Sequence, residues 1–224
     1  MGIPLSHLAN ALMWAMQVSV LLPLAKAWHH RVELPRPLRW LGWYFPLSVV
    51  SALLGRWLPL LHLPNLHTII AFNVGKTLVL GLVLRQVLAD RWALGLSDAL
   101  LLLGLAAVVA AVAWLPLIDA TTTARLMQCV VLTVIALAYL EQASRLPTGR
   151  LSADPYFWLC VGQLGYAAAT VAAFSTGTAL YYAGWQNVVS TTMALAGLYQ
   201  NYTLWQVYAH APAPSGHLAT PRLP

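Results

Sequence analysis

The sequence predicts an all-α fold, a polytopic membrane protein built as a bundle of seven transmembrane helices, with the N-terminus outside and the C-terminus cytoplasmic. Hydrophobic residues make up 60% of the 224 residues and charged residues only 8%, whereas a soluble domain carries roughly 25% charged residues. Apolar stretches of bilayer length recur along the chain, and basic residues fall on alternate sides of them. We expect a membrane domain over residues 1–208 and a disordered cytoplasmic tail over residues 209–224.

Seven stretches reach the roughly 20 apolar residues that a helix needs to cross the hydrocarbon core. Their continuous, Leu- and Ala-rich composition argues against a barrel, whose strands would be about ten residues long with alternating polarity. The connections are too short to hold a domain. The predicted spans are Leu8–Ala25, Leu38–Leu60, Leu66–Val87, Trp92–Ile118, Thr122–Leu140, Pro155–Phe174 and Leu180–Val207.

Proline marks irregular points within three of these spans. Pro23 lies in the first span, Pro46 in the second and Pro116 in the fourth. Because proline lacks a backbone N–H and its ring crowds the preceding turn, we expect these helices to bend there. The last residues, APAPSGHLATPRLP, are rich in proline and small residues, a composition typical of a disordered segment.

The basic residues divide unequally between the two sides that seven spans create. One side receives only Arg56 and Arg125. Since Lys and Arg collect in cytoplasmic loops, the other side is predicted to be cytoplasmic. The net charge of +6 is scattered along the chain, so we expect membrane lipids and no nucleic acid as partners. The nine residues on the predicted cytoplasmic side are Lys26, Arg31, Arg36, Arg39, Arg85, Arg91, Arg145, Arg150 and Arg222.

Lys76 lies at the centre of the third span, in the stretch HTIIAFNVGKTLVLGLVLRQV. A charge at mid-bilayer costs roughly 2.5–3.5 kcal/mol on insertion scales, so such residues usually face the bundle interior and find a polar partner. One interpretation of Lys76 is therefore a ligand, ion or proton site. The other is a structural lysine that snorkels or bonds to a neighbour. The sequence leaves both open.

Polar, uncharged residues at similar depth could line one cavity with Lys76 in the outer half of the bundle. Asn73 lies one turn before Lys76 on the same helix face, and the others come from the fifth, sixth and seventh spans. The same side chains could instead form the interhelical hydrogen bonds that hold any membrane bundle together. The predicted ligand-binding residues are Lys76, Asn73, Gln128, Gln163, Tyr166, Asn187 and Thr191.

The sequence offers no catalytic set, and we expect neither enzymatic activity, nor a cofactor, nor a metal site. HExxH and GxSxG motifs are absent, and Cys129 and Cys160 stand singly in apolar runs, unlike a Cys/His cluster. Seven spans with a buried lysine invite comparison with retinal proteins. Here the last span has no lysine and no span carries a deep carboxylate, which argues against a retinal pigment.

The stretch DPYFWLCVGQLGYAAATVAAF at the sixth span combines a proline, an aromatic–Trp pair, a glycine and a tyrosine. Together with an Asn before the third span and LYQNYTLW at the end of the seventh, it resembles uncharacterised seven-helix integral membrane proteins of Bacteroidota-type bacteria. The residues of the sixth span that carry the resemblance are Pro155, Phe157, Trp158, Gly162 and Tyr166.

The resemblance implies a place and a role. Members of that family are often encoded near sensor histidine kinases, which implies a signalling protein of the bacterial inner (plasma) membrane with a sensor kinase as its cytoplasmic partner. The family often carries an acid in the middle of the third span, where this chain has Lys76.

Three functions stay open. The first is a sensor or signalling partner that binds a small or lipophilic ligand in the outer half and passes a helix shift to a cytoplasmic protein. The second is a small-solute transporter or channel, which needs polar positions through both halves. The third is a structural assembly subunit. The inner-half polar positions that we count toward a channel are Gln17, Asp98, Glu141, Gln200 and Asn201.

Overall fold

The computed structural model describes residues 5–145, 151–182 and 186–211, with side chains over residues 6–145, 151–174 and 187–211. Within these residues the chain forms α-helices and one 3₁₀ turn, and no strand, as predicted. Residues 212–224 of the predicted tail lie outside them. The elements are α1 (Leu5–Ser19), α2 (Leu21–His29), α3 (Arg36–Leu41), α4 (Tyr44–Leu60), α5 (Leu66–Val87), α6 (Arg91–Trp114), α7 (Leu117–Arg145), η1 (Leu151–Ala153), α8 (Pro155–Tyr182) and α9 (Gln186–Ala209).

The first predicted span is interrupted near Pro23. This residue has no N–H to bond the carbonyl of Ser19, four residues earlier, and α1 ends at Ser19 before α2 begins at Leu21. The Ser19 hydroxyl donates to the carbonyl of Met16 at 2.7 Å. Together α1 and α2 form one apolar passage from Ser6 to His29.

The second predicted span is divided, which corrects the prediction of one helix over Leu38–Leu60. Pro46 cannot bond the carbonyl of Gly42, so α3 ends at Leu41 and α4 begins at Tyr44. The predicted bend at this proline is therefore a break between two helices.

The turn between α6 and α7 is centred on Pro116. It stops α6 at Trp114, earlier than the predicted end of the fourth span at Ile118. The carbonyl of Pro116 then accepts the first backbone bonds of α7, which begins at Leu117 and not at the predicted Thr122. The Thr122 hydroxyl fits within this helix because it donates to the carbonyl of Ile118 at 3.2 Å.

The boundary between the last two helices also differs from the prediction. The sixth span was expected to end at Phe174, whereas α8 continues to Tyr182. No proline interrupts the run that follows Phe174, so nothing stops the helix there. Leu180, the predicted start of the seventh span, therefore belongs to α8, and α9 begins only at Gln186.

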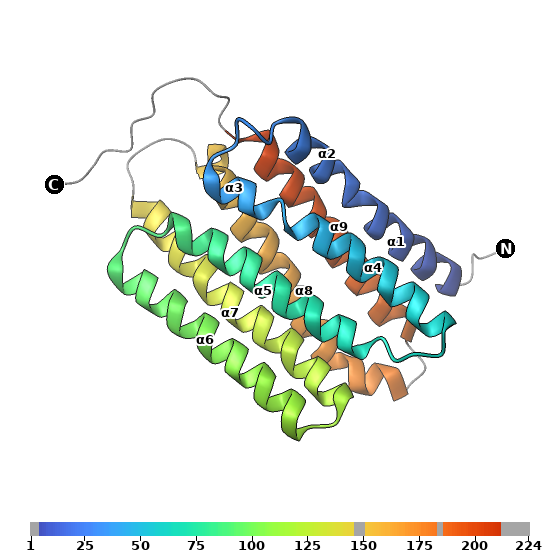
Figure 1. Cartoon of the computed structure of the whole chain (residues 1–224). Helices are drawn as coiled ribbons and strands as arrows, with labels where there is room; N and C mark the ends of the chain where they lie inside the picture. The colour runs from blue at the N-terminus through green and yellow to red at the C-terminus, as the bar shows by residue number, and fades with distance from the viewer. Residues whose placement is uncertain (1–4, 146–150, 183–185, 212–224) are drawn as a thin grey trace.

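The long helices lie side by side in one bundle (Figure 1). α9 packs against α8 and against α1 with α2, and α8 packs on α7. α7 in turn packs on α5 and α6, while α3 and α4 pack on α5. Two helix pairs, α1 with α9 and α4 with α5, thus form the two walls between which the site described below lies.

Glycine permits the closest helix crossings. A Cβ on Gly162 of α8 would lie 1.9 Å from the hydroxyl oxygen of Thr203 on α9. A Cβ on Gly197 of α9 would lie 2.3 Å from the sulfur of Met16 on α1. Small residues at such crossings let two helix backbones approach, as in membrane bundles.

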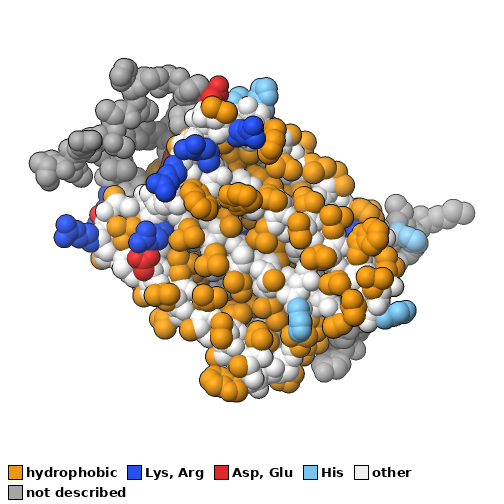
Figure 2. All heavy atoms as spheres, viewed as in Figure 1, with side chains coloured by type: hydrophobic (Ala, Val, Ile, Leu, Met, Phe, Trp, Pro, Cys, Tyr) orange, Lys and Arg blue, Asp and Glu red, His pale blue; other side chains and the backbone are white. Residues whose placement is uncertain are grey.

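Within the described residues, five helical segments are long and apolar enough to cross a membrane. They correspond to the first, third, fourth, fifth and sixth predicted spans. Large apolar side chains also face outward, with Leu102 69% and Trp114 83% exposed. In Figure 2 hydrophobic side chains cover most of the visible face, and Lys and Arg side chains gather toward one end. This surface suggests a membrane protein.

Candidate functional site

Lys76 lies at the centre of the bundle. It projects from the middle of α5 into the interior and is only 1% exposed. Its Nζ donates a hydrogen bond to Oε1 of Gln200 on α9 at 2.8 Å. The Gln200 Nε2 then donates to Oε1 of Gln163 on α8 at 3.2 Å. One lysine thereby connects α5, α9 and α8.

Aromatic rings complete the surroundings of the Lys76 amine. Nζ lies 3.5 Å from the centre of the Tyr166 ring on α8 and 6.0 Å from that of Tyr44 on α4. A desolvated cation–π contact of this kind contributes about 2 kcal/mol. The amine is therefore stabilised by neutral dipoles and ring faces.

A cavity of about 530 Å³ opens beside Lys76. It lies between the α1–α9 wall and the α4–α5 wall, and it reaches Arg125 on α7 and Tyr166 on α8. Its size falls within the range of roughly 300–1,000 Å³ typical of small-molecule sites. We call it the Lys76 cavity. Its apolar lining includes Met13, Met16, Val49, Ile69 and Phe72.

Arg56 lies about 18 Å along α4 from Tyr44, at the rise of 1.5 Å per residue, and so marks the other end of the cavity lining. Its Nε donates to Oε1 of Gln17 on α1 at 2.9 Å. Its guanidinium lies 3.4 Å from the centre of the Trp14 ring. Arg56 thus joins the two walls across the cavity.

Arg125 is the third basic residue of the lining. It is partly buried, and its guanidinium lies 4.8 Å from the centre of the Phe174 ring. It lines the same cavity as Lys76, where two positive charges disfavour each other.

No carboxylate lines the Lys76 cavity. All six Asp and Glu residues fall within the described part of the chain, so this absence covers every acid in the sequence. Asp98 pairs with Arg85 and Asp154 accepts a hydrogen bond from Tyr139. The cavity is therefore basic without an internal counter-charge.

Beyond Lys76, toward the C-terminal ends of α5 and α9, large apolar side chains fill the bundle. They belong to one continuous core cluster. We call this region the apolar plug. Its most buried members, each at most 1% exposed, include Leu38, Leu41, Phe45, Leu80, Leu84 and Leu204.

The structure brings together three of the predicted ligand-binding residues, Lys76, Gln163 and Tyr166, and leaves the others apart. Asn73 is buried but uses its amide on its own helix, donating to the carbonyl of Ile69 at 2.9 Å. Neither of the predicted residues near the start of α9 belongs to the cavity lining. These two residues are Asn187 and Thr191.

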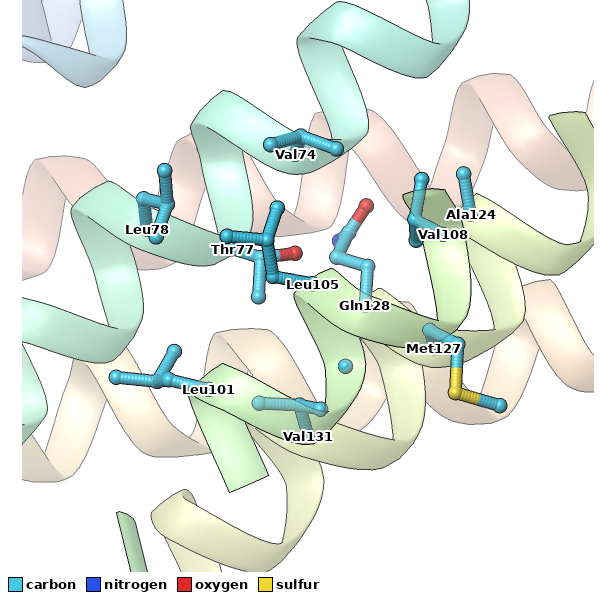
Figure 3. Close-up of a pocket in the computed structure, with 11 residues that line it drawn as sticks. Val74, Thr77, Leu78, Leu101, Leu105, Val108, Ala124, Met127, Gln128 and Val131 are labelled. Carbon is cyan, nitrogen blue, oxygen red and sulfur yellow. The ribbon is translucent and has the colours of Figure 1, made fainter. Parts of the chain in front are cut away.

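Gln128 faces a different space. Figure 3 shows its side chain pointing from α7 toward Val74 and Thr77 of α5. It borders a void of about 20 Å³ between α5, α6 and α7, close to the room that one water needs. Neither its Nε2 nor its Oε1 has a hydrogen-bond partner among the described residues. Gln128 is thus separate from the Lys76 cavity.

The sequence-based prediction missed Gln200, Arg125, Arg56 and Tyr44 as neighbours of one site. The two arginines were counted only as orientation charges, and Gln200 was assigned to the inner half. The sequence did contain one sign of their role, because Arg56 and Arg125 are the two basic residues on the side of the bundle that otherwise lacks positive charge.

Within the described ranges, no group of three or more His, Cys, Asp or Glu residues could hold a metal ion. Comparisons of the chain with protein-family models, with curated proteins and with solved structures found no match.

Proposed function

We propose that this chain is a seven-pass inner-membrane sensor or signalling partner that binds a small or lipophilic ligand in the Lys76 cavity. The observation that carries the proposal is a cavity of about 530 Å³ against a buried lysine whose described hydrogen bond goes to a neutral amide. Mostly apolar walls with a few convergent polar groups are typical of a ligand site.

The membrane topology belongs to the same proposal. The α3–α4 segment and α9 supply the two passes beyond the five helical segments that are long and apolar enough. The start of α1 and Arg56 then lie outside, and the end of α9 lies in the cytoplasm. The gathering of Lys and Arg at one end of the bundle in Figure 2 supports this direction.

The apolar plug favours a sensor over an open channel. A channel needs polar positions through both halves, whereas the bundle beyond Lys76 is packed with Leu and Phe side chains. A ligand that entered between the two walls would move α1 with α9 relative to α4 with α5. Such a shift would carry to the cytoplasmic ends of these helices, where a kinase-type partner would bind.

Native mass spectrometry of the protein extracted from its own membranes tests ligand binding. We expect a small molecule to co-purify with the wild-type protein and to be lost from Lys76→Met. The Arg145→Gln variant, altered at an exposed residue of α7 far along the chain from the cavity lining, should retain it. A wild-type protein that is ligand-free, or equal occupancy in all three proteins, would contradict the proposal.

Signalling requires a second measurement. Chemical cross-linking in native membranes should recover a cytoplasmic protein bound to the chain, in an amount that changes between wild type and Lys76→Met. Recovery of a constant stoichiometric membrane partner, equal in both proteins, would favour the structural-subunit alternative instead.

A further inference from the structure

Basic residues are concentrated in the lining of the Lys76 cavity. Three of the twelve Lys and Arg residues line it, namely Lys76, Arg56 and Arg125. The two guanidinium groups stay protonated in any protein environment. None of the six Asp and Glu side chains lies in the lining.

The contacts of these three residues leave their charge uncompensated. Each lies over an aromatic ring. Arg56 lies over the ring of Trp14, Arg125 over that of Phe174, and Lys76 over that of Tyr166. The two hydrogen bonds described for them go to neutral glutamine oxygens. Elsewhere the chain does pair its charges, as Arg85 does with Asp98 through two bonds.

The charge density is costly as it stands. Lys76 and Arg125 line one cavity that contains no Asp or Glu side chain; two cations there would repel each other, and buried cations are normally paired with an anion. An oxyanion between them would remove the repulsion and form charge-assisted hydrogen bonds, which are about twice as strong as neutral ones.

The walls indicate what else the ligand carries. Between the basic groups the lining combines methionine, isoleucine, valine and phenylalanine side chains with uncharged Asn, Gln and Ser side chains, and most of its surface is apolar. A fully hydrated inorganic anion would leave this apolar surface unused, whereas a hydrocarbon chain would cover it.

We propose that the Lys76 cavity binds an amphiphilic oxyanion, a molecule with a carboxylate or phosphate head and an apolar chain. The inference rests on the proposed ligand-binding function and names the class of ligand. The head lies between Lys76 and Arg125, and the chain packs against Met13, Ile69 and Phe72 on the way toward Arg56.

Titration calorimetry with the full chain in phosphatidylcholine nanodiscs tests this assignment, with empty nanodiscs as the blank. The probes share a twelve-carbon chain and differ in the head: dodecanoate, dodecyl phosphate, dodecanol and dodecyltrimethylammonium. Acetate and inorganic phosphate supply the head without the chain. We expect the two amphiphilic anions to bind at least tenfold more tightly than every other probe.

Variants locate the head. Arg125→Gln and Lys76→Met should each weaken dodecanoate binding about tenfold or more, since each removes a hydrogen bond to a charged group. Arg125→Lys keeps the charge and should recover part of the affinity. Arg145→Gln, the matched control, should bind dodecanoate like wild type. Equal melting temperatures establish that a weakened variant is folded.

The possible results separate this inference from the function on which it rests. If dodecanol or dodecyltrimethylammonium bound as tightly as dodecanoate, and if this binding were lost in Lys76→Met, the ligand would not be an anion. The proposed ligand-binding function would still stand. If acetate or inorganic phosphate bound as tightly as the amphiphiles, the ligand would need no apolar chain, and the cavity would be a site for a free anion. No saturable binding of any probe would overturn the assignment, while the co-purification experiment decides the proposed function independently.

Discussion

Gln200 determines how Lys76 is accommodated in the bundle. Its amide oxygen accepts from the lysine and its amide nitrogen donates to Gln163, so the two glutamines align their dipoles with the amine. A buried amine without such an acceptor keeps its desolvation cost and loses the bond that offsets it.

A double-mutant cycle measures the coupling energy between Lys76 and Gln200. Gln200→Leu should lower the free energy of unfolding by about 1–3 kcal/mol, because it leaves the buried Lys76 amine unpaired. Adding Lys76→Met should recover much of this loss, since two apolar side chains then replace the polar pair. Denaturation in detergent measures both.

Gln206→Leu on the same helix is the matched control, because the described bond of the Gln206 side chain goes to the exposed hydroxyl of Tyr202. It should change stability little. Additive losses in the double mutant would contradict a direct Lys76–Gln200 coupling.

Lys76 could be predicted as buried from the sequence because a single charge stands out in an apolar run. Gln200 could not be placed beside it, because the predicted seventh span began at Leu180. From that start Gln200 lies about 30 Å along the helix, near its inner end. From the observed start at Gln186 the distance is about 21 Å, close to mid-depth. An error in one helix boundary thus changed the assigned role of a residue.

At the scale of the elements, glycine sets how closely α8 and α9 pack. Gly162→Ala should lower the melting temperature, because its new Cβ would meet Thr203 at 1.9 Å. Gly95→Ala on α6 is the control, since no atom lies within 4 Å of a Cβ there. In the interior of a helix this change should be neutral or stabilising by about 0.5–1 kcal/mol. Equal melting temperatures for the two variants would contradict close α8–α9 packing.

The end of α4 contains one strained residue. His62 has φ 57°, in the left-handed region that costs a non-glycine residue about 1–2 kcal/mol. The N–H of Leu63 bonds the carbonyl of Leu58 at 2.9 Å, and that of His62 bonds Pro59 at 3.1 Å, which together form the Schellman end of the helix.

His62→Gly should therefore stabilise the protein by about 1 kcal/mol. The same change at His67, inside the first turn of α5, should destabilise it, since glycine is a poor helix former. Melting curves of the two variants in one detergent make the comparison. A lower melting temperature for His62→Gly would show that the histidine side chain, and not its backbone, matters at this position.

The elements were largely predictable where the sequence carries a strong local signal. The third span, Leu66–Val87, matches α5 at both ends because apolar residues fill it, Pro64 precedes it and the charged Asp90 and Arg91 follow it. Proline positions indicated where the first two spans are interrupted, but not that Pro46 would separate α3 from α4. The end of α8 lacks a breaker, so composition alone could not place it.

At the scale of the whole molecule, charge and packing divide the bundle into two halves. One half contains a basic cavity, and the other is filled by the apolar plug. The pairing of the two walls around the cavity could not be predicted from one sequence, because it depends on which helices pack against each other. The alternation of basic residues does predict the direction of insertion.

Labelling with a membrane-impermeant maleimide tests this arrangement most directly, because the native Cys129 and Cys160 are buried and should stay unlabelled. Single cysteines replace Ser6, at the start of α1, and Ser215, in the C-terminal segment. In intact cells, Ser6→Cys should react from outside, and Ser215→Cys should react only after the membrane is opened. Reaction of Ser215→Cys in intact cells would contradict the seven-pass topology and, with it, an outward-facing Lys76 cavity.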